Sequence, residues 1–215
     1  GLSGPGLAVM AGADGQAERG RAAMDWRKLV RDSFVSPREV ARQLIGLELQ
    51  PGILLQAAAA ISALSVVLGF LALELGPGDL DQVSAAIITT PFLGAFIQFA
   101  AICLVALLTA RIGGLFGGTG GFQASLTLVV WLNAMMLIIQ MLQIVLLLVL
   151  PPLAGIVALA AIVWVLWAFA NFVTELHGFE NPFFVLGGVI LSMIVLFFGF
   201  AMILAVLGIT PQEPM

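Results

Sequence analysis

The charged residues of this chain leave four long intervals in which no charge occurs. These intervals separate Glu48 from Glu74, Asp81 from Arg111, Arg111 from Glu175, and Glu180 from Glu213. A helix that crosses a membrane needs roughly 20 consecutive apolar residues, and every interval reaches that length. Lipid-facing backbone must satisfy its hydrogen bonds within its own segment, which favours helices for runs this long and this apolar. The chain is therefore predicted to be an all-α integral membrane protein.

The third interval is too long for one crossing, and Pro151 and Pro152 lie near its middle. Because a helix loses backbone hydrogen bonds at proline, we expect two helices that meet at this pair. The composition agrees with a membrane protein, since 61% of the residues are hydrophobic and 9% are charged, whereas soluble domains carry about 25% charged residues. The sequence thus predicts five transmembrane helices, at about 53–75, 84–110, 123–150, 152–174 and 183–209.

Three further segments flank this membrane domain, which we place at residues 51–209. Residues 1–24 are rich in Gly and Ala and are expected to form a disordered leader, either native or an added extension. Residues 25–50 are predicted to be a cytoplasmic amphipathic segment. Residues 210–215 are expected to form a short tail on the outer side.

The segment 25–50 combines cationic and apolar residues at helical spacing. Its first half places four apolar residues on one helical face: Trp26, Leu29, Val30 and Phe34. Ser36, Pro37 and Glu39 then form the pattern of a capping box at the start of a second helix. A basic amphipathic helix beside a span is typical of a segment that lies on an anionic membrane surface, and packing on the membrane domain is the alternative. The predicted surface contacts are Trp26, Arg27, Lys28, Arg31, Arg38 and Arg42.

All eight Lys and Arg residues fall on one side of the predicted topology. Seven of them lie at or before Arg42, and the eighth is Arg111, in the expected loop 111–122. Cytoplasmic segments close to membrane spans carry an excess of Lys and Arg. We therefore expect a multi-pass protein of the cell inner (cytoplasmic) membrane, with its N-terminus in the cytoplasm and its C-terminus outside.

A glycine-rich stretch from Gly113 to Gly121 precedes the predicted third span. It does not match a nucleotide-binding phosphate loop, which needs a Lys, because no Lys follows Lys28. One interpretation is a lipid-phosphate site at the helix start, formed by Arg111, Gly120 and Gly121. The alternative is that the glycines permit a tight turn between closely packed helices.

Amide side chains lie on one face of the predicted third span. Asn133, Gln140 and Gln143 project in similar directions at 100° per residue. Amides at this depth usually face protein or water. They form either a polar pathway for a small solute or ion, or hydrogen bonds that hold the helices of a bundle together.

Few residues support catalysis or a cofactor. His177 is the only His, and it lies beside Glu175 and Glu180 in the expected loop 175–182. Metal catalysis normally needs three or more convergent protein ligands, so we interpret this region as a polar loop. The single Cys103 excludes an intrachain disulfide and a thiol cluster. We expect no catalytic site, no metal site, no cofactor and no nucleic-acid partner.

Three stretches carry a likeness to a known family: FVSPREVARQL, GGLFGGTGGFQASLTLVVW and ELHGFENPFFVL. They resemble the bacterial branch of the Yip domain family, the Ypt/Rab-interacting multi-pass membrane proteins, over about residues 34–209. The resemblance implies a cytoplasmic N-terminus and an outward C-terminus. The signature Asp-Leu-Tyr-Gly-Pro of the eukaryotic members is absent, so the resemblance supplies an architecture more than a mechanism.

These observations favour a non-enzymatic membrane protein that organises membrane lipids or partner proteins. The expected partners are lipids and either another protein or a second copy of the chain within the membrane. The alternative is a small transporter or channel that uses the amide stripe of the third span.

Overall fold

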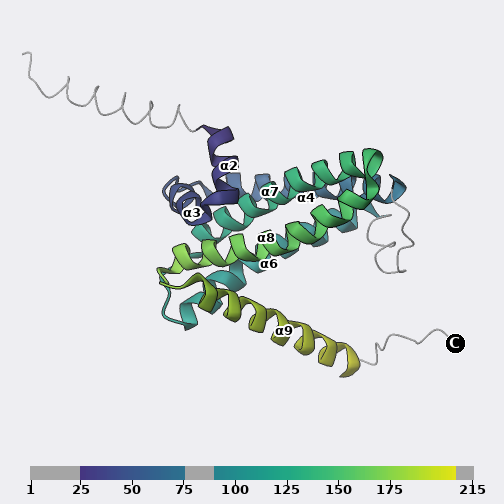
Figure 1. Cartoon of the computed structure of the whole chain (residues 1–215). Helices are drawn as coiled ribbons and strands as arrows, with labels where there is room; N and C mark the ends of the chain where they lie inside the picture. Colours follow the sequence, from purple (N-terminus) through teal and green to yellow (C-terminus); the bar gives the residue numbers. More distant parts are fainter. Residues whose placement is uncertain (1–24, 76–89, 207–215) are drawn as a thin grey trace, which may run out of the picture.

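The computed structural model describes residues 25–75 and 90–206, and within these ranges every regular element is a helix. Two short helices precede five long ones (Figure 1): α2 (Trp26–Val35), α3 (Pro37–Ile45), α4 (Pro51–Leu75), α6 (Pro91–Leu115), α7 (Phe122–Val149), α8 (Pro151–His177) and α9 (Pro182–Val206). The five long helices are all long and apolar enough to cross a membrane. The predicted all-α architecture with five spans is confirmed.

The long helices form a bundle with α7 at its centre, in contact with α4, α6 and α8. Between Ser125 and Val130 every residue of α7 is buried. Among the described elements α9 packs mainly against α8, where Val185 meets Ala170 and Val173. Figure 1 shows α9 leaving the other helices at an angle, and most of its described side chains are exposed, as expected for a surface that faces lipid.

The two ends of the bundle differ in charge. One end is formed by the α6–α7 loop, the α8–α9 loop and the start of α4, and α2 and α3 pack next to it. We call this end the cationic end. We call the far end the one formed by the α7–α8 turn at Leu150. The chain direction and the packing of α3 on α7 and α8 put six described cations toward the cationic end: Arg27, Lys28, Arg31, Arg38, Arg42 and Arg111.

Two helices continue further toward the cationic end than the charge pattern suggested. The helix α6 extends to Leu115, so Arg111 lies on a helix and not in a loop. The helix α8 extends to His177, where Gly178 ends it with a left-handed backbone (φ 73°), a conformation that glycine adopts without steric cost. The physical reason is packing, because Gly113 and His177 are both buried against each other.

The other ends of the spans lie close to their predicted positions or outside the described residues. The helix α6 begins at Pro91 with proline in its first turn, and the predicted start near residue 84 lies outside the described ranges. The same holds for the predicted leader 1–24, the last residues of the fifth span and the tail 210–215.

The amphipathic segment forms two helices that meet at Ser36. Asp25 caps α2, because its carboxylate accepts hydrogen bonds from the backbone N–H groups of Arg27 (3.1 Å) and Lys28 (3.3 Å). Ser36 occupies the N-cap position of α3, as predicted, but its side chain makes no capping hydrogen bond. The expected capping box is therefore not formed. Ser36 also ends α2, with its N–H bonded to the carbonyl oxygen of Asp32 at 2.7 Å, so the turn between the two helices sets its conformation.

Candidate functional site

The helices α2 and α3 pack on the bundle through their apolar faces. Four of their residues are buried in one cluster with residues of α7 and α8: Leu29, Val40, Ala41 and Leu44. The facing residues are Leu128, Leu132, Ala168, Phe172 and Leu176. Because this face is covered by protein, only the remaining faces of α2 and α3 are available to lipid or a partner.

Aromatic side chains fix the position of α2 along the bundle. The indole N–H of Trp131 donates a hydrogen bond to Ser33 Oγ (3.0 Å), and that hydroxyl donates to the carbonyl oxygen of Leu29 (2.8 Å). Phe34 stacks on Trp164 with 4.6 Å between ring centroids. Trp26 lies 6.0 Å from Trp131 by the same measure.

Three of the four tryptophans of the chain lie on α2 or contact it. Trp26 is on α2 itself, Trp131 and Trp164 contact it, and Trp167 packs against the same buried cluster. Tryptophan is enriched at membrane–water interfaces, where its ring is apolar and its N–H is polar. Such a grouping is typical of an interfacial aromatic belt.

Two of the six predicted surface contacts, Arg38 and Arg42, face the bundle. Glu175 on α8 lies 2.8 Å from Arg42 Nε and 3.5 Å from Arg38 Nε. Arg38 also donates to the carbonyl oxygen of Phe179 at 3.4 Å. The hydrogen bond from Arg42 to Glu175, together with the charge of that carboxylate, raises the pKa of Arg42 above its ordinary value. This ion-pair group joins α3 to the end of α8.

The other four predicted contacts lie on α2 and are exposed. Arg27 and Lys28 are exposed, and the side chain of Arg31 is 79% exposed with Asp32 at 3.4 Å. Trp26 is 57% exposed despite its contact with Trp131. The exposed side of α2 thus combines three cations with an aromatic ring, and we call it the α2 cationic face.

The glycine-rich stretch packs around His177, which sequence reasoning placed in a polar loop. His177 is buried on the last turn of α8, with 4% exposure, and its Nδ1 lies 3.1 Å from the carbonyl oxygen of Val173. A Cβ at Gly113 or Gly118 would overlap the imidazole ring, and one at Gly120 would overlap Leu176. The interpretation of His177 as an exposed loop residue is wrong, because the glycines leave room for its ring.

The three residues of the expected lipid-phosphate site have different surroundings. Arg111 is exposed on α6, and Gly121 is the N-cap of α7 with open space beside it. Gly120 instead packs beneath Leu176. The glycines at 113, 118 and 120 are therefore explained by close approach of helices, while an anion contact at Arg111 stays a prediction.

The amide stripe of α7 is used partly in contacts between helices. Gln140 and Ser65 on α4 form two hydrogen bonds, of 3.0 and 3.1 Å. Asn133 accepts a hydrogen bond from Gln98 on α6 at 3.3 Å and donates one to the carbonyl oxygen of Val129. Such amide pairs commonly join membrane helices, so these two residues link α7 to α4 and α6.

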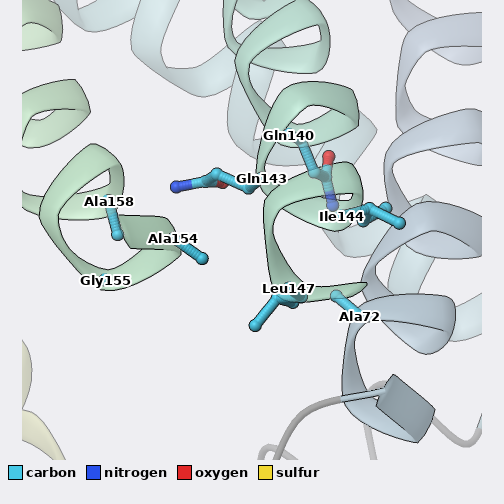
Figure 2. A pocket seen from close by; sticks show the side chains of 8 residues that line it. All are labelled: Ala72, Gln140, Gln143, Ile144, Leu147, Ala154, Gly155 and Ala158. Carbon is cyan, nitrogen blue, oxygen red and sulfur yellow. The ribbon is translucent and has the colours of Figure 1, made fainter. Parts of the chain in front are cut away.

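Gln143 lies beside a small cavity between α4, α7 and α8. The cavity has a volume of about 300 Å³ and is lined by Ala72, Gln140, Gln143, Ile144, Leu147, Ala154, Gly155 and Ala158. Figure 2 shows the Gln143 side chain reaching from α7 toward Ala158. The lining is mostly apolar, and its only polar side chains are the two amides.

In the described ranges no group of three or more His, Cys, Asp or Glu side chains converges as metal ligands would. Gly118 and His177 are brought together, as are Glu175 and the arginines of α3. Sequence reasoning missed both groups, because each joins segments that are far apart in the chain.

A scan against protein-family models matches the Yip1 domain over residues 31–203. The match begins within α2 and reaches into α9, so it includes the second half of α2, all of α3 and α4 to α8, and most of α9. Searches of curated proteins and of solved structures found no match. The family match covers most of the chain, and the chain therefore belongs to the Yip1 domain family of multi-pass membrane proteins.

Proposed function

We propose that this protein is a non-enzymatic organiser of membrane lipids or partner proteins, and that the α2 cationic face holds it to anionic headgroups. The observation that carries the proposal is the exposure of Arg27, Lys28 and Arg31 on a helix whose apolar face is already docked on the bundle. Each Lys or Arg near an anionic surface contributes about 1 kcal/mol of attraction. Three such residues on one short helix together attract anionic headgroups strongly enough to hold α2 at the membrane surface.

The charge asymmetry supports a cytoplasmic location for the cationic end. Lys and Arg near membrane spans favour the cytoplasmic side, and the far-end turn around Leu150 carries only apolar residues. We therefore propose a cytoplasmic-membrane protein with its N-terminus in the cytoplasm and its C-terminus outside. In this orientation the α2 cationic face meets the anionic inner leaflet.

A fluorophore on α2 tests the headgroup contact in the whole protein. Val35 is 70% exposed, so an environment-sensitive dye on Val35→Cys, with Cys103→Ala, reports the surroundings of α2. The protein is reconstituted into phosphatidylcholine vesicles with or without phosphatidylglycerol. We expect a larger blue shift of the dye with phosphatidylglycerol, and weakening of that difference by salt, because exposed charges are screened.

Two variants define what the shift means. The triple variant Arg27→Gln, Lys28→Gln and Arg31→Gln should lose the dependence on phosphatidylglycerol. The matched control Arg111→Gln removes a cation from the same end but not from α2, and should keep it. A dye signal in the unaltered protein that ignores headgroup charge would contradict the proposal.

A transporter or channel is the second candidate, favoured by the cavity beside Gln140 and Gln143. It requires water at the amide stripe within the membrane. Cys substitutions at Asn133, Gln140 and Gln143, made without Cys103, can be probed in vesicles with a membrane-impermeant thiol reagent. Rapid labelling at all three positions would favour transport, whereas uniform protection would favour a role in packing.

A further inference from the structure

Charged residues limit the apolar surface of α7 and α8 on both sides. Toward the cationic end the limit is α2, whose exposed Arg27, Lys28 and Arg31 are costly to place in hydrocarbon. Toward the far end the limit is Glu74, an exposed carboxylate near the end of α4. Between these limits lies the part of this surface that acyl chains contact.

The hydrogen bonds of Gln140 set the level of Glu74. Gln140 pairs with Ser65, and α4 and α7 run in the same direction, from the cationic end to the far end. Glu74 follows Ser65 by as many residues as Val149 follows Gln140. Glu74 therefore lies level with the last residue of α7, beside the α7–α8 turn. From Ile144 to Ala170 the chain has no charged, amide or hydroxyl side chain, so hydrocarbon extends up to that turn.

The length of this apolar surface follows from the helical rise. At 1.5 Å per residue, Trp131 lies about 27 Å from the end of α7 at Val149. By the same rise, Trp164 lies about 20 Å from the start of α8 at Pro151. Both tryptophans contact α2, so the surface is about 20–27 Å long, and any tilt of the bundle shortens it. An average bilayer has a hydrocarbon core of roughly 30 Å.

We infer that the side of the bundle formed by α7 and α8 fits a thinner bilayer than average, and that it gathers phospholipids with short acyl chains. A mismatch in length is relieved when the bilayer thins locally, and lipids with shorter chains require less thinning. This inference rests on the proposed function in one respect, which is the placement of α2 at the membrane surface. It adds the chain length of the lipid to the charge of its headgroup.

The native tryptophans report on this surface without any label, because three of them lie on α2 or contact it and Trp167 packs against the same buried cluster. The unaltered protein is reconstituted in mixtures of a dibrominated phosphatidylcholine, which quenches tryptophan, and an unbrominated one with myristoleoyl, oleoyl or erucoyl chains. The recovery of fluorescence gives the relative binding constant of each unbrominated lipid. We expect the constant to fall about two- to threefold from myristoleoyl to erucoyl chains.

A relative binding constant that is independent of acyl-chain length, or that rises toward erucoyl chains, would overturn the inference. The triple variant Arg27→Gln, Lys28→Gln and Arg31→Gln removes the charges that limit the surface at α2, and its preference should move toward oleoyl chains. If the preference for acyl-chain length were unchanged in that variant, the charges of α2 would not be what limits the apolar surface. Headgroup charge is constant in this series, so a failure here is distinct from a failure of the dye experiment on α2.

Discussion

The imidazole ring of His177 occupies the space that a side chain at Gly113 would need. The two residues are on different helices, α8 and α6. Gly118, in the α6–α7 loop, faces the same ring. The glycine-rich stretch is thus a joint that lets α6, α7 and the end of α8 approach closely. The buried Nε2 of His177 has no hydrogen-bond partner among the described residues, so the ring is held by the contact of its Nδ1 with the carbonyl oxygen of Val173 and by its fit against the glycines.

Gly113→Ala should destabilise the protein by about 1–3 kcal/mol, because overpacking a tight contact forces the ring or the helix to move. Its neighbour Gly114 is the matched control, since a Cβ there would meet nothing within 4 Å. Gly114→Ala should be neutral or stabilise, as alanine is preferred over glycine in a helix. Thermal unfolding in detergent, followed by circular dichroism, measures both. An equal loss of stability in the two variants would show that close packing at Gly113 is not what the glycine provides.

A second variant keeps this prediction informative if Gly113→Ala does not fold. His177→Ala removes the ring, so adding Gly113→Ala to it should cost much less than adding it to the unaltered protein. Such an interaction energy between contacting residues is what a double-mutant cycle measures. Additive losses would mean that the two residues do not share the contact.

The four charge-free intervals, together with the Pro151–Pro152 pair that divides the third, were sufficient to predict five helices, because lipid leaves the backbone no other way to satisfy its hydrogen bonds. They did not predict where α6 and α8 end. Arg111 and Glu175 interrupt the apolar pattern, yet both helices continue past them, since Gly113 and His177 bury each other. A charge marks where lipid contact stops, whereas packing decides where a helix stops.

The candidate site was predicted in part. The spacing of Trp26, Leu29 and Phe34 correctly indicated an amphipathic α2, since helical periodicity is a local property. The ion pairs of Glu175 with Arg38 and Arg42 join residues that are far apart in the chain. A single sequence holds no signal for such a pair, because it arises only when α3 docks on α8.

Glu175→Gln should loosen α3 at the end of α8. The arginines are 40% and 71% exposed, so solvent screens the pairs and the expected loss of stability is small. Hydrogen exchange of the α3 amides in nanodiscs should become faster. The matched variant Glu39→Gln removes an exposed carboxylate of α3 itself and should leave the exchange nearly unchanged. Similar hydrogen exchange of the α3 amides in the two variants would argue that the ion pairs of Glu175 do not hold α3 on α8.

Gln140→Leu should weaken the contact between α4 and α7. Side-chain hydrogen bonds between membrane helices contribute about 0.6 kcal/mol on average, and Gln140 makes two with Ser65. Gln143→Leu is the natural comparison, because that amide lines the cavity and has no hydrogen bond to another described residue. Thermal unfolding should therefore rank Gln140→Leu as the more damaging change. The reverse order would mean that the amide at 143 carries the greater structural role.

Trp131→Phe and Trp164→Phe separate hydrogen bonding from ring packing in the docking of α2. Trp131 donates to Ser33 Oγ at 3.0 Å, so its replacement should cost about 0.5–1.5 kcal/mol for the lost bond. The buried N–H of Trp164 has no partner within the described part of the chain, and phenylalanine keeps a ring to stack on Phe34. Removing an unpaired buried donor is nearly neutral or stabilising. Thermal unfolding should show a clear loss for Trp131→Phe alone, and a comparable loss for Trp164→Phe would assign the docking energy to ring volume instead.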